Sequence, residues 1–317
     1  MYCSLLVFIT CEVVIACVLL CQNQANFSMK LKTVKLEKCI AEFTSSLSSL
    51  SGKSRKIVDK ATTLQVPLVS LASVNFEKLE TLGSGSYGTC YRHKFPDMEE
   101  TVCIKVFKHN PVRGPGWRAM LLEVEALKSI DGISGTPRLI AVSPVAPSAI
   151  IMSDVGTLTF LEWLKTNPGT PREAILALKK ISTIVQQIHA RRLSHNDLHE
   201  RNVIIDERNE PSVVDFGNML PFGVRTWRTL FFTKMIFRQM IGIEAVGASN
   251  DIMRFGKLLR DSLSFFSLDA SIENDLKKLA RDCIRLKVGS IGDVVTKLEV
   301  ILWRYDEQLR STFRQGE

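Results

Sequence analysis

Three polar side chains in the middle of the chain have the types and spacing that phosphate chemistry needs. Asp197 and Asn202 lie in the run HNDLHERN, and Asp215 follows in VVDFG, thirteen residues after Asn202. Metal-assisted phosphoryl transfer needs carboxylate and amide oxygens for Mg²⁺ and another carboxylate that orients the attacking hydroxyl. Short apolar runs follow Asn202 and precede Asp215, and they predict a strand hairpin that carries these side chains on two loops.

A glycine-rich run precedes these residues in the sequence. Gly83, Gly85 and Gly88 form a GxGxxG pattern, and glycines without Cβ atoms let backbone amides approach phosphate oxygens closely. Strand-like sequence lies on both sides of the pattern, at residues 76–82 and 89–93. A dinucleotide-binding fold would place the pattern between a strand and a helix. We therefore expect a hairpin whose turn covers phosphates.

Lys105 is the only charged residue in the apolar strand pattern of residues 102–107. It is either an edge-strand lysine or a point charge for nucleotide phosphates, and the second role needs a carboxylate to hold it. A helix pattern over residues 121–127 offers one, because Glu123 shares a face with an apolar residue at i, i+4 spacing. We expect Glu123 to point towards Lys105 and Glu125 to face elsewhere.

The second half of the chain has the pattern of a helical domain. An apolar strand at residues 149–152 leads to a helix that begins near Thr159. Another helix is predicted to begin after Thr170, because proline follows this residue and Glu173 completes a capping box. The buried stripe of that helix is predicted to consist of Leu178, Ile181, Val185 and Ile188.

The ordered set GxGxxG, VCIK, Glu123, HND-x4-N and DFG resembles the eukaryotic-like protein kinase family, of which the chain would be a divergent member. The resemblance covers about Phe76 to Leu309. It implies an α+β, bilobal fold, with a small antiparallel β-sheet lobe of five strands and one helix, a larger and mainly α-helical lobe, and a nucleotide between the lobes. It places the kinase domain at residues 76–309 and a tail at 310–317.

The resemblance also implies roles for the residues singled out above. The glycines of the hairpin would cover the phosphates, and Lys105 would contact the α- and β-phosphates while pairing with Glu123. Asp197 would be the catalytic carboxylate, and Asn202 and Asp215 would bind Mg²⁺.

Further residues match positions around the adenine ring in this family. These are Cys90 and Cys103 above the ring, Ile204 below it, Met152 at the gatekeeper position, and Ser153 to Val155 in the hinge. Asp251 resembles the aspartate of the core helix that braces the catalytic loop.

The sequence departs from the family pattern in three places. Asn196 replaces the arginine that is usual before the catalytic aspartate, and His199 replaces the lysine typical of serine/threonine kinases. The run Asp-Leu-His is similar to antibiotic and choline phosphotransferases. No Ala-Pro-Glu motif ends the activation segment, which runs through residues 227–237.

The resemblance implies an ATP- and Mg²⁺-dependent protein kinase that transfers the γ-phosphate to serine or threonine hydroxyls of a protein substrate. A small-molecule phosphotransferase and a nucleotide-binding pseudokinase scaffold are the alternatives. No nucleic-acid partner is expected, because no basic stripe interleaved with aromatic residues is present.

The N-terminal region has a different character. Residues 3–21 form an apolar, Cys-rich run, interrupted by Glu12, that is long enough to cross a membrane as a helix. Three interpretations of this run stay open. It is a transmembrane anchor over residues 1–22, it is a cleaved signal segment, or it never meets a membrane. Residues 23–75 are interpreted as a basic and Ser-rich linker. The lysines after the run would place the kinase domain on the cytoplasmic side of a membrane, and a soluble cytoplasmic protein is the alternative.

Composition excludes several other classes. Hydrophobic residues make up 45% and charged residues 23% of the 317 residues, so a wholly disordered, collagen-like or multi-spanning chain is excluded. Of the net charge of +8, residues 22–60 contribute eight bases against three acids. Beyond residue 39 only three scattered cysteines occur, which predicts a reduced intracellular domain without a disulfide framework.

Overall fold

The computed structural model describes residues 52–85, 87–96, 98–108, 116–166, 169–224 and 247–315. The chain divides into two compact units. The small unit comprises the described residues up to Lys128 together with Arg138–Asp154, and the helical unit comprises Ser129–Pro137 and the residues from Val155 onwards.

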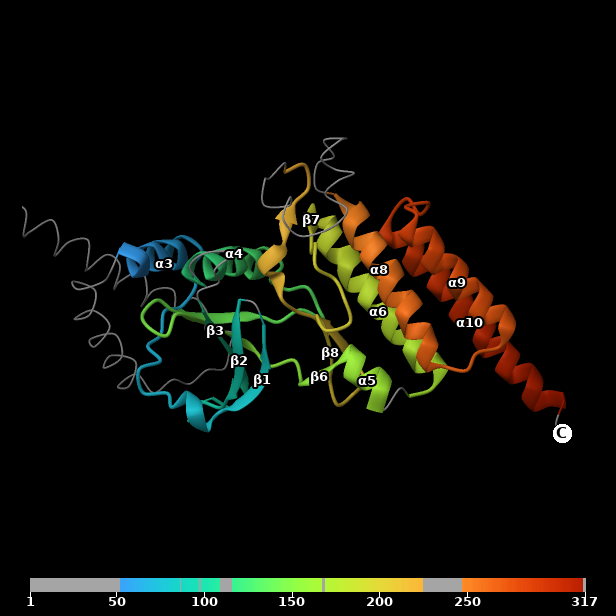
Figure 1. Ribbon diagram of the computed structural model, residues 1–317, viewed down its shortest axis with the longest axis horizontal. Coiled ribbons are helices and arrows are strands. Elements are labelled where there is room, and N and C mark those ends of the chain that lie inside the picture. Colours follow the sequence, from blue (N-terminus) through green and yellow to red (C-terminus); the bar gives the residue numbers. More distant parts are fainter. Residues whose placement is uncertain are drawn as a thin grey trace, which may run out of the picture. The chain divides into compact units, whose positions relative to one another are not determined.

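The small unit is built on a five-stranded antiparallel sheet with the strand order β1-β2-β3-β5-β4 (Figure 1). The strands are β1 (Glu80–Ser84), β2 (Gly88–His93), β3 (Val102–Phe107), β4 (Leu139–Ser143) and β5 (Ala149–Ser153). Its helices are α3 (Gly52–Thr63), the short 3-10 helix η1 (Phe76–Lys78) and α4 (Gly116–Ser129). This sheet, together with the helical unit described below, confirms the predicted α+β fold.

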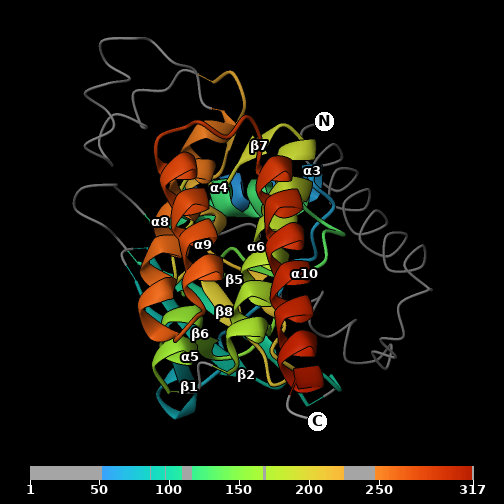
Figure 2. The ribbon, with the colours of Figure 1, turned by 90° about the vertical axis from the view of Figure 1, so that its right-hand side faces the viewer.

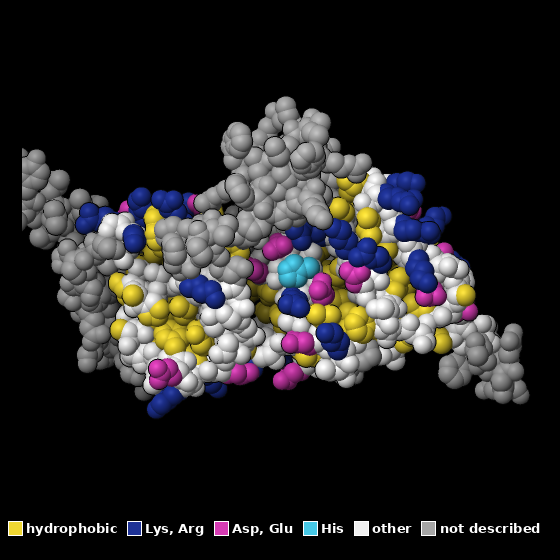
Figure 3. All heavy atoms as spheres, viewed as in Figure 1, with side chains coloured by type: hydrophobic (Ala, Val, Ile, Leu, Met, Phe, Trp, Pro, Cys, Tyr) yellow, Lys and Arg dark blue, Asp and Glu magenta, His cyan; other side chains and the backbone are white. Residues whose placement is uncertain are grey.

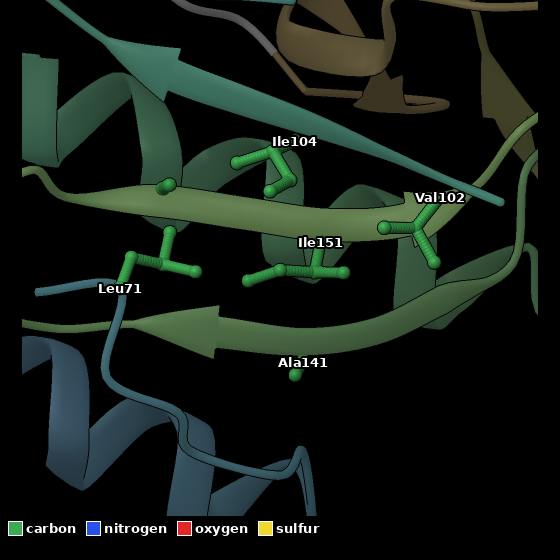
Figure 4. Close-up of a cluster of buried hydrophobic side chains, with 6 residues drawn as sticks. Leu71, Val102, Ile104, Ala141 and Ile151 are labelled. Atoms are coloured by element: carbon green, nitrogen blue, oxygen red, sulfur yellow. The ribbon is translucent and has the colours of Figure 1, made fainter. Parts of the chain in front are cut away.

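A cluster of apolar side chains covers the face of this sheet opposite Lys105. Because successive side chains of a strand point to opposite faces, Val102 and Ile104 of β3 lie on that face. Both are fully buried with Ile151 of β5, and they pack with Ala141 and Leu71 (Figure 4). Leu71 comes from the segment before the sheet, so the strands do not complete this core alone.

The segment that supplies Leu71 also pairs with the edge strand β4. The amide of Val69 donates to the carbonyl of Val142 over 3.0 Å, and the amide of Val142 donates to the carbonyl of Pro67 over 2.9 Å. We expected this segment to be part of a linker over residues 23–75. From Gly52 onwards it is instead packed on the small unit, because an edge strand has unpaired backbone groups that a neighbouring segment can satisfy. Residues 23–51 lie outside the described part of the chain.

Helix α3 is a second helix of the small unit, which the resemblance did not imply. It lies beside α4 (Figures 1 and 2) and buries Ile57. Lys60 forms an ion pair with Glu125 of α4, and the Lys56 ammonium lies 5.5 Å from the ring centroid of Trp117 at the start of α4. An ion pair and a cation–ring contact therefore join α3 to α4.

The strand expected over residues 76–82 begins later than predicted. The Asn75 side chain accepts a hydrogen bond from the Glu77 amide over 3.1 Å and caps η1, and β1 begins only at Glu80. Phe76 packs edge-on against Tyr91 of β2 instead, with ring centroids 5.3 Å apart. A side-chain cap thus outweighs the alternating pattern at this position.

The helical unit contains a bundle of long helices and several short strand pairs (Figure 2). Its helices are α5 (Phe160–Thr166), α6 (Pro171–Ala190), η2 (Phe216–Asn218), α8 (Ala248–Ser262), η4 (Leu263–Phe265), α9 (Ala270–Ile284) and α10 (Ile291–Gln315). Its strands are β6 (Leu158–Thr159), β7 (Leu193–Ser194), β8 (Val203–Ile205), β9 (Pro211–Val213) and β10 (Leu220–Pro221).

Local sequence signals explain where these helices begin and how closely they pack. The predicted capping box at Thr170 is confirmed, and the predicted apolar stripe of α6 is buried. On α8, a Cβ at Gly256 would lie 2.6 Å from the Cys283 Cβ, so glycine allows α8 and α9 to pack closely. Helix α10 continues past Leu309, the predicted end of the domain, to Gln315.

On the face shown in Figure 3, basic and acidic side chains are interspersed over the helical unit. None of the helices within the described ranges is both long and apolar enough to cross a bilayer. The apolar run at residues 3–21 lies outside those ranges.

We predict that Leu71→Ala destabilises the small unit. Leu71 is 1% exposed, so the change leaves a cavity under β3 and β5, and the loss in free energy of unfolding should be about 2–5 kcal/mol. Leu122→Ala is the control, because Leu122 is 38% exposed and should cost less than about 1 kcal/mol. Chemical denaturation of the two variants measures both values. Equal losses would show that the segment before the sheet adds nothing to its stability.

Candidate active site

In the small unit, Lys105 and Glu123 form a buried ion pair. Lys105 points from β3 to α4, where its Nζ lies 2.7 Å from both carboxylate oxygens of Glu123. The two residues are 6% and 2% exposed. Glu125 faces α3 instead, as the helical spacing predicted. A charge pair in an apolar surrounding needs this close geometry to offset the loss of hydration.

The glycine pattern forms the predicted β1–β2 hairpin. Its glycines differ in whether the surrounding structure requires them. A Cβ at Gly88 would lie 2.1 Å from the Val106 carbonyl oxygen, so β3 leaves no room for any other residue. At Gly83 and Gly85 a Cβ would meet nothing within 4 Å. The described part of the chain therefore gives no steric reason for these two glycines, whereas a ligand that approaches the backbone would give one.

Cys90, Cys103 and Met152 lie on the same face of the sheet as Lys105. Cys90 is opposite Lys105 in the β2–β3 register, and Cys103 is opposite Met152 in the β3–β5 register. Two effects raise the pKa of the Cys103 thiol: mainly its hydrogen bond with Cys90, and also its burial. This thiol is therefore neutral at physiological pH. The face combines small or flexible apolar side chains with one fixed charge.

The predicted hinge residues close the end of β5. Ser153 Oγ accepts a hydrogen bond from the Arg138 amide over 2.9 Å, and the Asp154 carboxylate accepts from Arg92 Nε over 2.6 Å. In the helical unit, Val155 is followed by Gly156, whose φ is +108°, a value that favours glycine.

In the helical unit, Asp251 of α8 holds the loop that contains Asp197. Its fully buried carboxylate accepts hydrogen bonds from the backbone amides of His195 and Asn196, each over 2.8 Å, and from Ser194 Oγ over 2.9 Å. His189 Nε2 donates to the same carboxylate over 2.9 Å. Burial alone would raise the pKa of Asp251, but the hydrogen bond and charge of His189 lower it below its ordinary value. This residue braces the loop as expected.

His195 connects this loop to the strand before Asp215. Its ring is buried, with Nε2 donating to the Val214 carbonyl over 3.0 Å and Nδ1 accepting from the Asp197 amide over 3.2 Å. The two loops that carry the candidate carboxylates are therefore tied together through one imidazole.

Asn196 occupies the position where an arginine was expected from the family. Its φ of +63° lies in the left-handed region, which asparagine tolerates better than most residues. Its Nδ2 donates to the carbonyl oxygens of Ser194 and Asn218 over 3.2 and 3.3 Å. The substitution thus places a short side chain that closes the loop where a charge would otherwise stand.

Asp197, Asn202 and Asp215 lie together around one end of the β8–β9 hairpin. Asn202 Nδ2 donates to the Asp197 carbonyl over 2.9 Å, and the Val214 amide donates to the Asn202 carbonyl over 2.9 Å. Asp215 follows directly, with φ at +63°, and precedes η2. The hairpin brings the three residues together as the spacing predicted.

Asn202 and Asp215 fit the oxygen donors that Mg²⁺ prefers. The bond through Nδ2 leaves the Oδ1 of Asn202 as a ligand atom, and the Asp215 carboxylate supplies the second type of donor. The residues that the structure describes contain no group of three His, Cys, Asp or Glu side chains suited to a metal. Two oxygen donors fit a Mg²⁺ ion that arrives with phosphate oxygens and water.

His199 and Ile204 complete the predicted set in this unit. Burial lowers the pKa of His199, so its ring is mainly neutral at pH 7, although the Asp197 carboxylate acts in the opposite direction. Ile204 lies in β8 opposite Thr159 of β6, and its side chain lies next to Gly156. A Cβ at Gly156 would lie 3.3 Å from the Ile204 Cγ2.

Sequence reasoning missed two partners of Asp197. Asn218 Nδ2 donates to one carboxylate oxygen of Asp197 over 3.0 Å, and the Arg254 guanidinium lies 3.2 Å from the other. The available signal was the position of Arg254, three residues after Asp251 and on the same face of α8. The activation segment at residues 227–237 lies outside the described ranges.

Comparison with known proteins finds a match to one family. Residues 76–226 match the family described as the protein kinase domain. A probable casein kinase I homolog from Encephalitozoon cuniculi is 22% identical over 143 residues, which cover 44% of this chain and 44% of that protein. Cyclin-dependent kinase 14 from Homo sapiens is 27% identical over 145 residues, covering 45% of this chain and 30% of that protein.

A bacterial protein is also similar. The serine/threonine-protein kinase PrkC of Bacillus subtilis is 22% identical over 151 residues, which cover 46% of this chain and 23% of that protein. The matches thus span less than half the length of these curated relatives. The matched domain, the five-stranded sheet and the ordered motifs agree with one another, and together they support a protein kinase domain over residues 76–226.

Proposed function

We propose that the chain is an ATP- and Mg²⁺-dependent protein kinase that transfers the γ-phosphate of ATP to serine or threonine hydroxyls. The buried Lys105–Glu123 ion pair carries this proposal. Such a pair often stabilises a fold no more than apolar residues of similar volume, so stability alone gives little reason for it. Its presence on the face that carries Cys90 and Cys103 favours a use for the lysine charge. The similarity to a serine/threonine-protein kinase supports the choice of acceptor.

Each charged residue of the site has a role in this proposal. Lys105, held by Glu123, contacts the α- and β-phosphates. Asp197 accepts the proton of the attacking hydroxyl. Asn202 and Asp215 hold Mg²⁺, which when bound neutralises charge on the phosphate oxygens. Positioning and charge neutralisation then account for most of the rate.

The remaining predicted residues bind the nucleotide in this proposal. Gly83, Gly85 and Gly88 lie over the phosphates, and the adenine ring contacts Cys90, Cys103, Met152, Ser153, Val155 and Ile204. The kinase domain is proposed to span residues 76–309, and residues 3–21 stay a predicted membrane anchor that would leave this domain on the cytoplasmic side.

We predict that the full chain, given labelled ATP, Mg²⁺ and a mixed peptide pool, phosphorylates peptides. Asp197→Asn, Asp215→Asn and Lys105→Met should each lower the rate by about 100-fold or more, because proton acceptance, metal binding or phosphate contact is lost. Mass spectrometry of the products identifies the acceptor residue.

Glu207→Gln is the matched control for the aspartate variants, since Glu207 lies exposed in the turn between β8 and β9 and should leave the rate unchanged. Peptide labelling that persists in Asp197→Asn would contradict the proposal. If small alcohols are phosphorylated and peptides are not, the result would favour a small-molecule phosphotransferase. If ATP binds without turnover, the result would favour a nucleotide-binding scaffold.

The two kinds of glycine predict two different defects. Gly85→Ala should raise the KM for ATP several-fold while changing the free energy of unfolding by no more than about 0.5 kcal/mol, because its Cβ enters open space. Gly88→Ala should destabilise the fold by about 1–3 kcal/mol, because its Cβ collides with the Val106 carbonyl. Thermal unfolding and ATP titration separate the two effects. A stability loss in Gly85→Ala with normal ATP affinity would assign that glycine to the fold alone.

A further inference from the structure

The carboxylate of Asp197 is held at both of its oxygens by side chains from outside its own loop. Asn218 Nδ2 donates to Oδ2 over 3.0 Å, and Arg254 Nη1 lies 3.2 Å from Oδ1. Asn218 is the last residue of η2, and Arg254 lies on α8. The two donors approach different oxygens, so together they limit the rotation of the carboxylate about its last bond.

Helix α8 acts on the same loop twice. Asp251 accepts hydrogen bonds from the backbone amides of the loop, and Arg254, three residues later on the same face, contacts the side chain of Asp197. The helix thus fixes the path of the loop with a carboxylate and the orientation of its acidic side chain with a guanidinium.

A purely stabilising role fits the Arg254 contact poorly. The Asp197 side chain is 27% exposed and lies 3.2 Å from the Arg254 guanidinium, and ion pairs that solvent can reach contribute little to stability. The Nε of Arg254 is buried and has no hydrogen-bond partner among the described residues, which itself costs free energy. What the guanidinium achieves is a defined place for a carboxylate that solvent and an acceptor can still reach.

We propose that Arg254 is a positioning residue for phosphoryl transfer, which acts by holding the carboxylate of Asp197 opposite Asn218. In the transfer, the acceptor oxygen forms a bond to the γ-phosphorus, and the bond from that phosphorus to its bridging oxygen breaks as ADP leaves. The hydroxyl proton passes to the Asp197 carboxylate, whose oxygens keep lone pairs beyond those used by the two donors. This inference rests on the proposed function.

The test compares variants of the full chain by steady-state kinetics with ATP, Mg²⁺ and the mixed peptide pool. Arg254→Met should lower kcat by about 10–100-fold and leave the KM for ATP within about 2-fold, because positioning of the proton acceptor is lost while nucleotide contacts stay. Arg254→Lys should recover part of the loss, since an ammonium can still contact Oδ1. Arg260→Met is the matched control on the same helix, because Arg260 is exposed and pairs with the neighbouring Asp261.

The outcomes separate this inference from the proposed function. An active wild type whose Arg254→Met variant equals Arg260→Met overturns the inference alone, and so does an Arg254→Lys variant no better than Arg254→Met. If the wild type shows no turnover, or only turnover that persists in Asp197→Asn, both the inference and the proposed function are overturned. If thermal unfolding shows that Arg254→Met does not fold, Asn218→Ala decides, because it removes the other donor to the Asp197 carboxylate and leaves α8 unchanged. A kcat several-fold lower at unchanged KM supports the inference, and a wild-type kcat overturns it.

Discussion

The buried carboxylate of Asp251 is the interaction on which the candidate site of the helical unit depends. A fully buried charge is costly unless several donors satisfy it, and here two backbone amides, a hydroxyl and an imidazole do so. Each donor belongs to the loop before Asp197 or to the end of α6. Folding α8 against this loop therefore requires the loop to take one path, because any other path leaves the charge unsatisfied.

Hydrogen bonds connect Asp251 to the side chains that would take part in the chemistry. The His195 amide donates to Asp251, and the His195 ring donates to the carbonyl of Val214, the residue directly before Asp215. Asn202 closes the arrangement by bonding back to the Asp197 carbonyl, and Arg254 with Asn218 orients the Asp197 carboxylate. The acidic side chain remains accessible while almost everything around it is buried or bonded.

In the small unit the corresponding constraint is the Lys105–Glu123 ion pair, which depends on the position of α4. Two elements outside the predicted domain contribute to this part of the molecule. Helix α3 contacts α4 through the Lys60–Glu125 ion pair and through Lys56 and Trp117, and Leu71 fills the opposite face of the sheet. Leu71 thus supports β3, the strand of Lys105, from its other face, and α3 contacts α4, the helix of Glu123.

The sequence by itself determined the resemblance to protein kinases, which implied the five-stranded sheet. It also predicted the start of α6 and the pairing of Lys105 with Glu123, because motif order, spacing and helical periodicity can be read from the sequence alone. It did not show that Asn75 would cap a turn in place of a strand, that residues 67–71 would complete the sheet, or that Arg254 would reach Asp197. The Asn75 cap is a local contact with the Glu77 amide, which the alternating pattern obscured. The other two features join segments far apart in the chain, Arg254 with Asp197 and Leu71 with Ile151. Only the tertiary structure decided them, since a side chain finds a distant partner through packing of whole elements and not through a pattern in its neighbours.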